Sequence, residues 1–180
     1  MSKKVLMPLA DGFEEIEAVS VIDILRRAGV GVTIAGVGRR HLKSAREMSL
    51  IADLLIDEVK ADDFDLIVLP GGHDNAMTLA SDRDVQSLIG QMRAQGKWVA
   101  ALCAAPVALK NAGAIEGVYT CYPGYETQIG EGYTVKAVVE TGRTITSRGP
   151  GTAAAFAFAL VAKLCGEEKA QALREKMLFS

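Results

Sequence analysis

The sequence predicts an α/β fold in which a mostly parallel sheet is covered by helices on both faces. Short apolar runs alternate along the chain with segments of helical periodicity, which is the order that strand-helix-strand units produce. The runs are apolar for most of their length, as strands buried on both faces of a sheet are. The 180 residues suffice for a sizeable core, so we expect a single domain over residues 1–180.

The first half of the chain begins with a strand and a helix. Residues 3–10, KKVLMPLA, form a short apolar run that ends at a turn. Residues 14–29, EEIEAVSVIDILRRAG, show helical periodicity that stops at a glycine. The runs VGVTIAGVG at 30–38 and FDLIVLPGG at 64–72 predict two further strands.

A second helix and another strand follow. Residues 81–96, SDRDVQSLIGQMRAQG, are predicted to be helical because Ser81 suits an N-cap and Gly96 follows the last turn. The run KWVAAL at 97–102 predicts a buried strand, and APVALKNAG at 105–113 predicts a short helix.

The last part of the chain adds a hairpin and a closing helix. A small antiparallel addition is expected between Tyr119 and Ser147, because YTVKAVVETGRTITS predicts a hairpin that turns near Gly142. Residues 149–166, GPGTAAAFAFALVAKLCG, predict a helix so apolar on every side that it must be largely enclosed.

Composition excludes several classes of function. Twenty basic and 22 acidic residues give a formal net charge of −2, and no basic run tracks a phosphate backbone, so nucleic-acid binding is not expected. The most apolar run, at 153–162, is too short to span a membrane, and the first residues meet Asp11 too soon for a secretory signal. We expect a soluble, cytoplasmic protein.

No cofactor or metal is expected either. The glycine motifs of nucleotide-binding proteins are missing, and His41 and His73 have no ligand set near them in the sequence. Cys103, Cys121 and Cys165 are an odd number of cysteines without metal-binding spacing, so the sequence suggests neither a disulfide framework nor a zinc site.

Three loops follow predicted strands at the end of the sheet where α/β proteins bind ligands. They are LADGFEE at 9–15, LPGGHDN at 69–75 and LCAAP at 102–106. In the third loop Cys103 stands at a sharp strand-to-helix turn, and Pro106 suits the first turn of the helix. Helix N–H groups facing the sulfur would lower the thiol pKa and make Cys103 a nucleophile. A buried cysteine acting as a small apolar side chain is the alternative, and spacing alone leaves both open.

The segment DGFEEIEAVSVIDIL at 11–25, which runs from the first loop into the predicted helix, offers three carboxyl groups, those of Glu14, Glu15 and Glu17. Glu17 shares a helical stripe with apolar residues, where burial favours the neutral acid that can donate a hydrogen bond to a thiolate. Glu14 also aligns with apolar residues, and all three carboxyls suit the positive end of a helix. Periodicity alone does not decide between them.

Gly71 and Gly72 in the second loop let the backbone approach a ligand closely. Their N–H groups, with that of Ala104, would form an oxyanion hole, although an ordinary turn explains the two glycines equally. His73 follows them and could reach the same crevice, but an exposed loop histidine is the simpler interpretation.

Taken together, these motifs resemble the ThiJ/PfpI superfamily, and within it the DJ-1-like branch of the parkinsonism-associated protein deglycase. The resemblance covers essentially the whole chain and rests on LADGFEEIEAV, DILRRAG, IVLPGG, ALCAAP and TSRGPGTAAAFA in that order. It implies a flavodoxin-like three-layer sandwich and a homodimer with the first helix near the interface. It also implies that Cys103 is the nucleophile, that Glu17 is its protonated partner, and that Gly72 and Ala104 supply the oxyanion N–H groups.

Two further positions, Arg46 and Arg148, match arginines that line the family's pocket region, but one pocket position departs from the family. The DJ-1-like pattern carries a histidine just before the proline that corresponds to Pro123, and this chain has Tyr122 there. Tyrosine, with a usual pKa of about 10, is a poor base at pH 7. His73 stays open as a substitute.

Peptidase and glutaminase activities are not expected. The PfpI branch has a histidine directly after the elbow cysteine, where this chain has Ala104, and the His-x-Glu of the amidotransferase relatives is absent. The first hypothesis is a glutathione-independent glyoxalase, a hydro-lyase, or a protein deglycase, a hydrolase. Cys103 would add to methylglyoxal, glyoxal or early glycation adducts as a hemithioacetal, and Glu17 would shuttle a proton toward the hydroxyacid. The rival is an oxidative-stress sensor or chaperone in which Cys103 is oxidised to a sulfinate.

Overall fold

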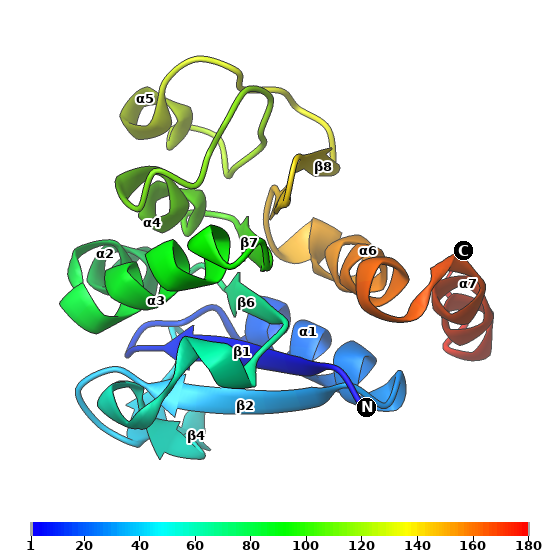
Figure 1. Cartoon of the computed structure of the whole chain (residues 1–180), viewed down its shortest axis with the longest axis horizontal. Coiled ribbons are helices and arrows are strands. Elements are labelled where there is room, and N and C mark those ends of the chain that lie inside the picture. The colour runs from blue at the N-terminus through cyan, green and yellow to red at the C-terminus, as the bar shows by residue number, and fades with distance from the viewer. Residues whose placement is uncertain (1, 180) are drawn as a thin grey trace.

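Within residues 2–179, which the computed structural model describes, seven strands form one sheet in the order β5-β2-β1-β6-β7-β9-β8 (Figure 1). Neighbouring strands are parallel except β8 and β9, which pair antiparallel at one edge. The strands are β1 (Lys4–Leu9), β2 (Gly31–Gly36), β5 (Leu54–Leu55), β6 (Leu66–Leu69), β7 (Trp98–Leu102), β8 (Val138–Thr141) and β9 (Thr144–Ser147).

Alternate residues of the central strands point to opposite faces of the sheet. In β1, Val5, Met7 and Leu9 belong to the apolar cluster on one face, and Leu6 belongs to the cluster on the other. Helices that contribute to the first cluster are α1 (Glu15–Arg27), α6 (Ala153–Cys165) and α7 (Glu167–Lys176). Helices that contribute to the second are α2 (His73–Ser81), α3 (Arg83–Ala94) and α4 (Pro106–Asn111). The predicted flavodoxin-like sandwich is confirmed.

The antiparallel addition lies where the sequence predicts it. β8 and β9 form a hairpin whose turn includes Gly142 at φ 60°, a left-handed conformation that glycine adopts without steric cost. The short helix α5 (Glu126–Ile129) and the 3-10 helix η3 (Pro150–Thr152) flank this hairpin in the chain. The apolar segment after it forms α6, in which six of the 13 residues are buried and Lys163 is exposed.

Several elements are not predicted from the sequence. They are helices α2, α5 and α7, the short strand β5, the 3-10 helices, and a two-stranded antiparallel hairpin of β3 (His41–Lys43) and β4 (Ser49–Ile51). The prediction of Ser81 as an N-cap is wrong, because Ser81 ends α2. The N-cap of α3 is Asp82, whose carboxylate accepts hydrogen bonds from the N–H groups of Asp84 and Val85, each at 3.0 Å.

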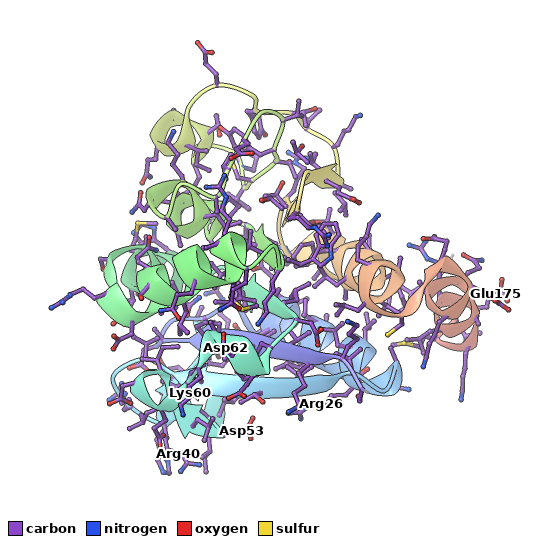
Figure 2. The ribbon with its side chains drawn as sticks, viewed as in Figure 1. Arg26, Arg40, Asp53, Lys60, Asp62 and Glu175 are labelled. Carbon is purple, nitrogen blue, oxygen red and sulfur yellow. The ribbon has the colours of Figure 1, made fainter. Side chains whose placement is uncertain are left out.

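Polar side chains lie along the edge of the sheet formed by β5 and the part of β2 beyond it (Figure 2). Asp53 accepts a hydrogen bond from the Ile34 N–H at 2.8 Å, and Arg40 donates to the carbonyl oxygens of Ala52 and Asp53 at 3.0 and 2.7 Å. The segment after β5 continues through the 3-10 helices η1 (Ile56–Glu58) and η2 (Ala61–Asp63). No helix within residues 2–179 is long and apolar enough to cross a membrane.

Candidate active site

The three predicted loops come together because β1, β6 and β7 are neighbours in the sheet. β6 pairs with β1 on one side and with β7 on the other, and all three run parallel. Their carboxyl ends therefore lie side by side, and α1, α2 and α4 follow them (Figure 1). Each loop contributes one part of the site.

Cys103 is at a strained elbow. β7 ends at Leu102 and α4 begins at Pro106, so almost no loop separates them. Cys103 has a φ of 62°, which costs a residue with a Cβ about 1–3 kcal/mol. Two hydrogen bonds hold it there: its N–H donates to the Ser147 carbonyl at 3.0 Å, and its carbonyl accepts from the Tyr122 N–H at 2.8 Å. The thiol thus leaves the strand in a direction that the surrounding backbone dictates.

The structure separates the two glutamates that periodicity leaves open. Glu14 is the N-cap of α1, and its carboxylate accepts a hydrogen bond from the Glu17 N–H at 2.8 Å. Glu17 is fully buried, and its Oε2 accepts a hydrogen bond from the Gly71 N–H at 2.7 Å. Its Oε1 is buried without a hydrogen-bond partner in residues 2–179. Glu15 turns toward Ser44, whose hydroxyl lies 3.1 Å from the Glu15 carboxylate.

Gly71 lies between the thiol and the carboxyl. A Cβ added to Gly71 would come within 2.8 Å of Glu17 Oε2, 2.9 Å of Cys103 Sγ and 2.5 Å of Cys103 Cβ. Glycine is therefore required here for space. Gly72 is required for a different reason, because its φ of 85° is left-handed and a Cβ would collide with the Gly12 carbonyl oxygen.

The oxyanion hole needs one correction. The Gly71 N–H donates to Glu17, so it does not point at a substrate, and the prediction that it belongs to the hole is wrong. The N–H groups of Gly72 and Ala104 face the Cys103 sulfur closely enough to act on its charge, and both favour a lower pKa of the thiol. They are thus placed where an oxygen bonded to the carbon that Cys103 attacks would also find donors.

Burial dominates the acid–base properties of the pair. It raises the pKa of Glu17 to about 7, and the Gly71 N–H and the Cys103 thiol only partly oppose this. Burial also raises the pKa of Cys103 to about 12, and the negative charge of Glu17 adds to the effect. The prediction of a lowered thiol pKa is wrong, because desolvation beside a carboxylate outweighs the N–H groups of Gly72 and Ala104.

Asn75 supports the site and was missed by sequence reasoning. It is fully buried, and its Oδ1 accepts a hydrogen bond from the Ala10 N–H at 2.7 Å. Its Nδ2 donates to the carbonyls of Pro70 and Gly71 at 2.8 and 3.1 Å, so one side chain ties the first loop to the second. An amide four residues after a Pro-Gly turn is the only sequence signal, and surface asparagines share it.

A row of aromatic side chains lies over the elbow. The rings of Tyr122 and Tyr125 are 6.4 Å apart and edge-on, and those of Tyr125 and His73 are 6.1 Å apart. His73 is exposed at the first position of α2, and its Nδ1 lies 2.7 Å from the Tyr125 hydroxyl oxygen. Tyr125, like Asn75, was not singled out from the sequence.

The two predicted arginines have different positions. Arg148 lines a hollow of about 280 Å³ beside the site, together with Tyr122, Pro123, Gly149, Pro150, Gly151 and Thr152. Its Nε is buried and finds no acceptor in the part of the chain that the structure describes. Arg46 is exposed and donates to the neighbouring Ala45 carbonyl at 3.1 Å. Within one chain, no hydrogen bond in the described residues joins Arg46 to the elbow.

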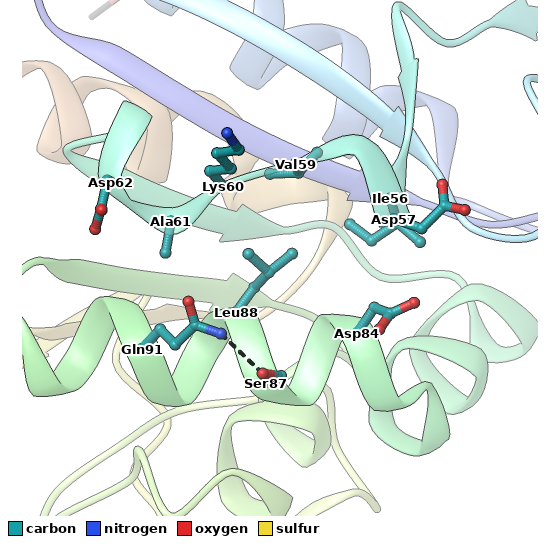
Figure 3. Close-up of a pocket in the computed structure, with 10 residues that line it drawn as sticks. All are labelled: Ile56, Asp57, Val59, Lys60, Ala61, Asp62, Asp84, Ser87, Leu88 and Gln91. Carbon is teal, nitrogen blue, oxygen red and sulfur yellow. Dashed lines mark hydrogen bonds between the residues drawn. The ribbon is translucent and has the colours of Figure 1, made fainter.

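Another cavity, also of about 280 Å³, lies between the η1–η2 segment and α3 (Figure 3). None of the predicted site residues lines it. Its lining residues are Ile56, Asp57, Val59, Lys60, Ala61, Asp62, Asp84, Ser87, Leu88 and Gln91. Elsewhere in residues 2–179, no group of three or more His, Cys, Asp or Glu side chains is arranged to hold a metal ion.

Comparison with known proteins adds a family and several named relatives. A model of the DJ-1/PfpI family matches residues 3–163. Protein dj-1beta of Drosophila melanogaster is 39% identical over 185 residues, which cover 100% of this chain and 99% of the relative. Its crystal structure superposes with a TM-score of 0.95 at 38% identity, covering 100% of both chains. The glutathione-independent glyoxalase DJR-1.2 of Caenorhabditis elegans is 34% identical over 182 residues, covering 99% of this chain and 97% of the relative.

Proposed function

The chain belongs to the DJ-1/PfpI family, and we propose that it is a cofactor-independent, glutathione-independent glyoxalase that converts small dicarbonyls such as methylglyoxal and glyoxal to hydroxyacids. One observation carries the proposal. The Cys103 sulfur lies between the carboxyl of Glu17 and the N–H groups of Gly72 and Ala104. A nucleophile, a proton carrier and an oxyanion site are thus within reach of one carbon atom.

The first step is addition of the thiol to the aldehyde. As Cys103 Sγ attacks the aldehyde carbon, the Glu17 carboxylate takes the thiol proton. The oxygen of the aldehyde gains negative charge and accepts hydrogen bonds from Gly72 and Ala104. Glu17 then passes its proton to that oxygen, which yields a neutral hemithioacetal. A base with a pKa of about 7 suits both transfers at neutral pH.

The second step is the internal rearrangement. The Glu17 carboxylate removes the hydrogen of the former aldehyde carbon as a proton, and the electron pair forms a carbon–carbon double bond. The second carbonyl oxygen takes a proton, which gives an enediol. Glu17 then returns its proton to the neighbouring carbon while the hydroxyl of the first carbon releases its proton to water, which yields a thioester of the hydroxyacid. Water cleaves the thioester, which releases lactate or glycolate and regenerates the thiol.

Removal of early glycation adducts, the deglycase activity, needs the same thiol and fits the same proposal. Such adducts are hemithioacetals or aminocarbinols in equilibrium with free dicarbonyl. An enzyme that consumes the dicarbonyl depletes them by mass action. The sensor hypothesis needs only the oxidation of the Cys103 thiol. It does not explain why N–H groups are placed to bind an oxyanion beside that thiol.

We also propose a homodimer that uses α1 and the β3–β4 hairpin. Ile16 and Val19 on α1 are 55% and 44% exposed, and Ile51 on β4 is 62% exposed. The hairpin lies beside the start of α1, because the Ala45 N–H donates to the Phe13 carbonyl at 2.8 Å. Together these side chains form an apolar surface of the kind that dimers cover. Sedimentation equilibrium should give a dimer for the wild type and a monomer for Val19→Glu.

The catalytic proposal is tested by following methylglyoxal turnover without glutathione. Purified wild-type protein is expected to form lactate continuously, and Cys103→Ala is expected to form none. Cys165→Ala is the matched control, because Cys165 is at the end of α6 and outside the site. No lactate from the wild type, or equal lactate from Cys103→Ala, contradicts the enzyme. Peroxide-dependent mass gain at Cys103 without turnover would favour the sensor.

A further inference from the structure

The proposed rearrangement needs a proton donor that the three loops do not supply. Glu17 carries the proton of the carbon atom, so it is not free to protonate the second carbonyl oxygen at the same time. The N–H groups of Gly72 and Ala104 serve the first oxygen. The second oxygen needs a donor on the open side of the elbow, away from α1.

Tyr125 has a hydroxyl group and belongs to a segment that contacts the elbow. Its backbone N–H donates to the Tyr122 carbonyl at 3.2 Å, and the Tyr122 N–H donates to the Cys103 carbonyl, so a short chain of backbone contacts joins Tyr125 to the elbow. The Tyr125 side chain is half-buried against the apolar cluster that contains Cys103.

His73 gives this hydroxyl a definite orientation. The Nδ1 of His73 lies 2.7 Å from the Tyr125 oxygen, and the rings are tilted by 50°. With its proton on Nδ1, the imidazole donates to the oxygen and leaves the hydroxyl proton free to turn toward a ligand. His73 also follows Gly72 directly, so the residue that orients Tyr125 is attached to one of the oxyanion donors.

We propose that Tyr125 is a second catalytic acid of this site, oriented by His73, which protonates the second carbonyl oxygen of a bound dicarbonyl. The inference rests on the proposed glyoxalase function. As Glu17 removes the proton from the first carbon, electrons move to the second oxygen, and the Tyr125 hydroxyl gives that oxygen its proton. The resulting tyrosinate accepts the His73 hydrogen bond and regains a proton from solvent. Tyr125 is a catalytic residue and His73 is a positioning residue.

Two further facts agree with these roles. Burial raises the pKa of Tyr125, and the negative charge of Cys103 adds to this, so the hydroxyl keeps its proton at neutral pH. His73 is exposed to solvent, so its substitution removes the hydrogen bond without opening the core.

The test compares kcat and KM for methylglyoxal in Tyr125→Phe, His73→Ala and His73→Asn. Tyr125→Phe is expected to lower kcat by about 10²-fold and to change KM by less than about threefold, since the lost proton donation acts in the transition state. His73→Ala is expected to lower kcat by about 10-fold, and His73→Asn to recover most of it, because an amide nitrogen can still donate to Tyr125. The Tyr125→Phe/His73→Ala double variant should be no slower than Tyr125→Phe, because the two act as one unit.

Matched controls are available in the chain. Tyr133→Phe removes a hydroxyl from a half-buried tyrosine that pairs with Tyr119 instead, and His41→Ala removes an exposed histidine on β3. Both are expected to keep wild-type kcat. The rate of Cys103 alkylation by iodoacetamide should stay within about twofold in every variant, because the hydroxyl acts after the thiol adds.

Several outcomes overturn the inference. One is wild-type kcat in Tyr125→Phe. Another is alkylation that slows in parallel with turnover, which would mark Tyr125 as structural. A third is additive loss in the double variant or no rescue by His73→Asn. If wild-type protein forms no lactate at all, the proposed function fails instead, so the two failures are distinguishable.

Discussion

Cys103 and Cys121 are two buried cysteines in the same apolar cluster, and only one of them has the surroundings of a nucleophile. Burial is the first cause that raises the pKa of each, to about 12 in both. Their backbones differ, because Cys103 has a φ of 62° and Cys121 is not among the positive-φ residues of 2–179. Their surroundings differ as well, since the N–H groups of Gly72 and Ala104 act on the thiol pKa of Cys103 and no N–H group in the described part of the chain acts on that of Cys121.

Neither burial nor a raised thiol pKa distinguishes Cys103 from Cys121, because both cysteines have both. What distinguishes Cys103 is a proton acceptor and two N–H donors arranged around one sulfur. Cys121 instead has Glu126 and Arg148 as its charged neighbours, and their effects on its pKa oppose each other. A nucleophile with a high pKa needs a base that takes its proton during attack, which is the role proposed for Glu17.

The largest expected effect separates the two thiols directly. Cys103→Ala should lower kcat/KM for methylglyoxal by at least about 10³-fold, because no other group forms the hemithioacetal. Cys121→Ala should stay within about threefold, since only packing changes. Steady-state assays of lactate formation on both variants, with thermal melts to confirm folding, measure this. Equal losses in the two variants would remove the distinction.

The next effect concerns the space between the thiol and its base. Gly71→Ala should lower kcat/KM by about 10²-fold, because its Cβ would come within 3 Å of both Cys103 Sγ and Glu17 Oε2 and push them apart. Gly90→Ala in α3 is the matched control, since a Cβ there meets nothing within 4 Å. It should keep activity and raise the free energy of unfolding by about 0.5–1 kcal/mol. A fully active Gly71→Ala would show that the thiol and carboxyl tolerate separation.

A third prediction concerns the carboxyl group of Glu17, which acts on the pKa of Cys103 and not on that of Cys121. The pKa of Glu17 is about 7 in the folded protein and 4.5 in an exposed carboxyl, so the folded state holds the proton more tightly. Its stabilising effect is fully present below pH 4.5 and is lost as the pH rises through 7. At pH 4.5 the free energy of unfolding of Glu17→Gln should therefore be equal to or lower than that of the wild type. Between pH 4.5 and pH 8 it should rise relative to the wild type by about 3 kcal/mol.

Urea unfolding of Glu17→Gln and wild type at the two pH values measures this difference, and Glu131→Gln on the surface is its control. The same Glu17→Gln variant should lose turnover, because an amide takes no proton from the thiol. A stability difference that does not change between pH 4.5 and 8 would mean that Glu17 is not buried as a carboxylate.

How much of this could be read from the sequence differs between the fold and the site. Apolar runs and capping residues predict the sandwich and place Cys103, Glu17 and Gly72 after the carboxyl ends of three neighbouring strands, because strand order in such sheets follows strong rules. They do not find α2 or α7, whose short polar segments carry weak periodicity. They also wrongly place the Gly71 N–H in the oxyanion hole, because the type of a residue does not determine the direction in which its backbone N–H points. Asn75 and Tyr125 were missed since each acts through contacts made far along the chain.

The smallest expected effect is on the free energy of unfolding: the difference between the glycine and alanine variants should have opposite signs at Cys103 and Cys121. At a φ of 62° the Cβ of an alanine causes steric strain that a glycine avoids. Cys103→Gly should therefore be more stable than Cys103→Ala by about 1 kcal/mol. At Cys121 the φ is not positive, and glycine there only adds freedom to the unfolded chain, so Cys121→Gly should be less stable than Cys121→Ala by about 1 kcal/mol. Urea unfolding of the four variants measures both differences. The same sign at both positions would mean that the elbow relaxes once its sulfur is removed, so that the strain belongs to the thiol and its donors and not to the backbone between β7 and α4.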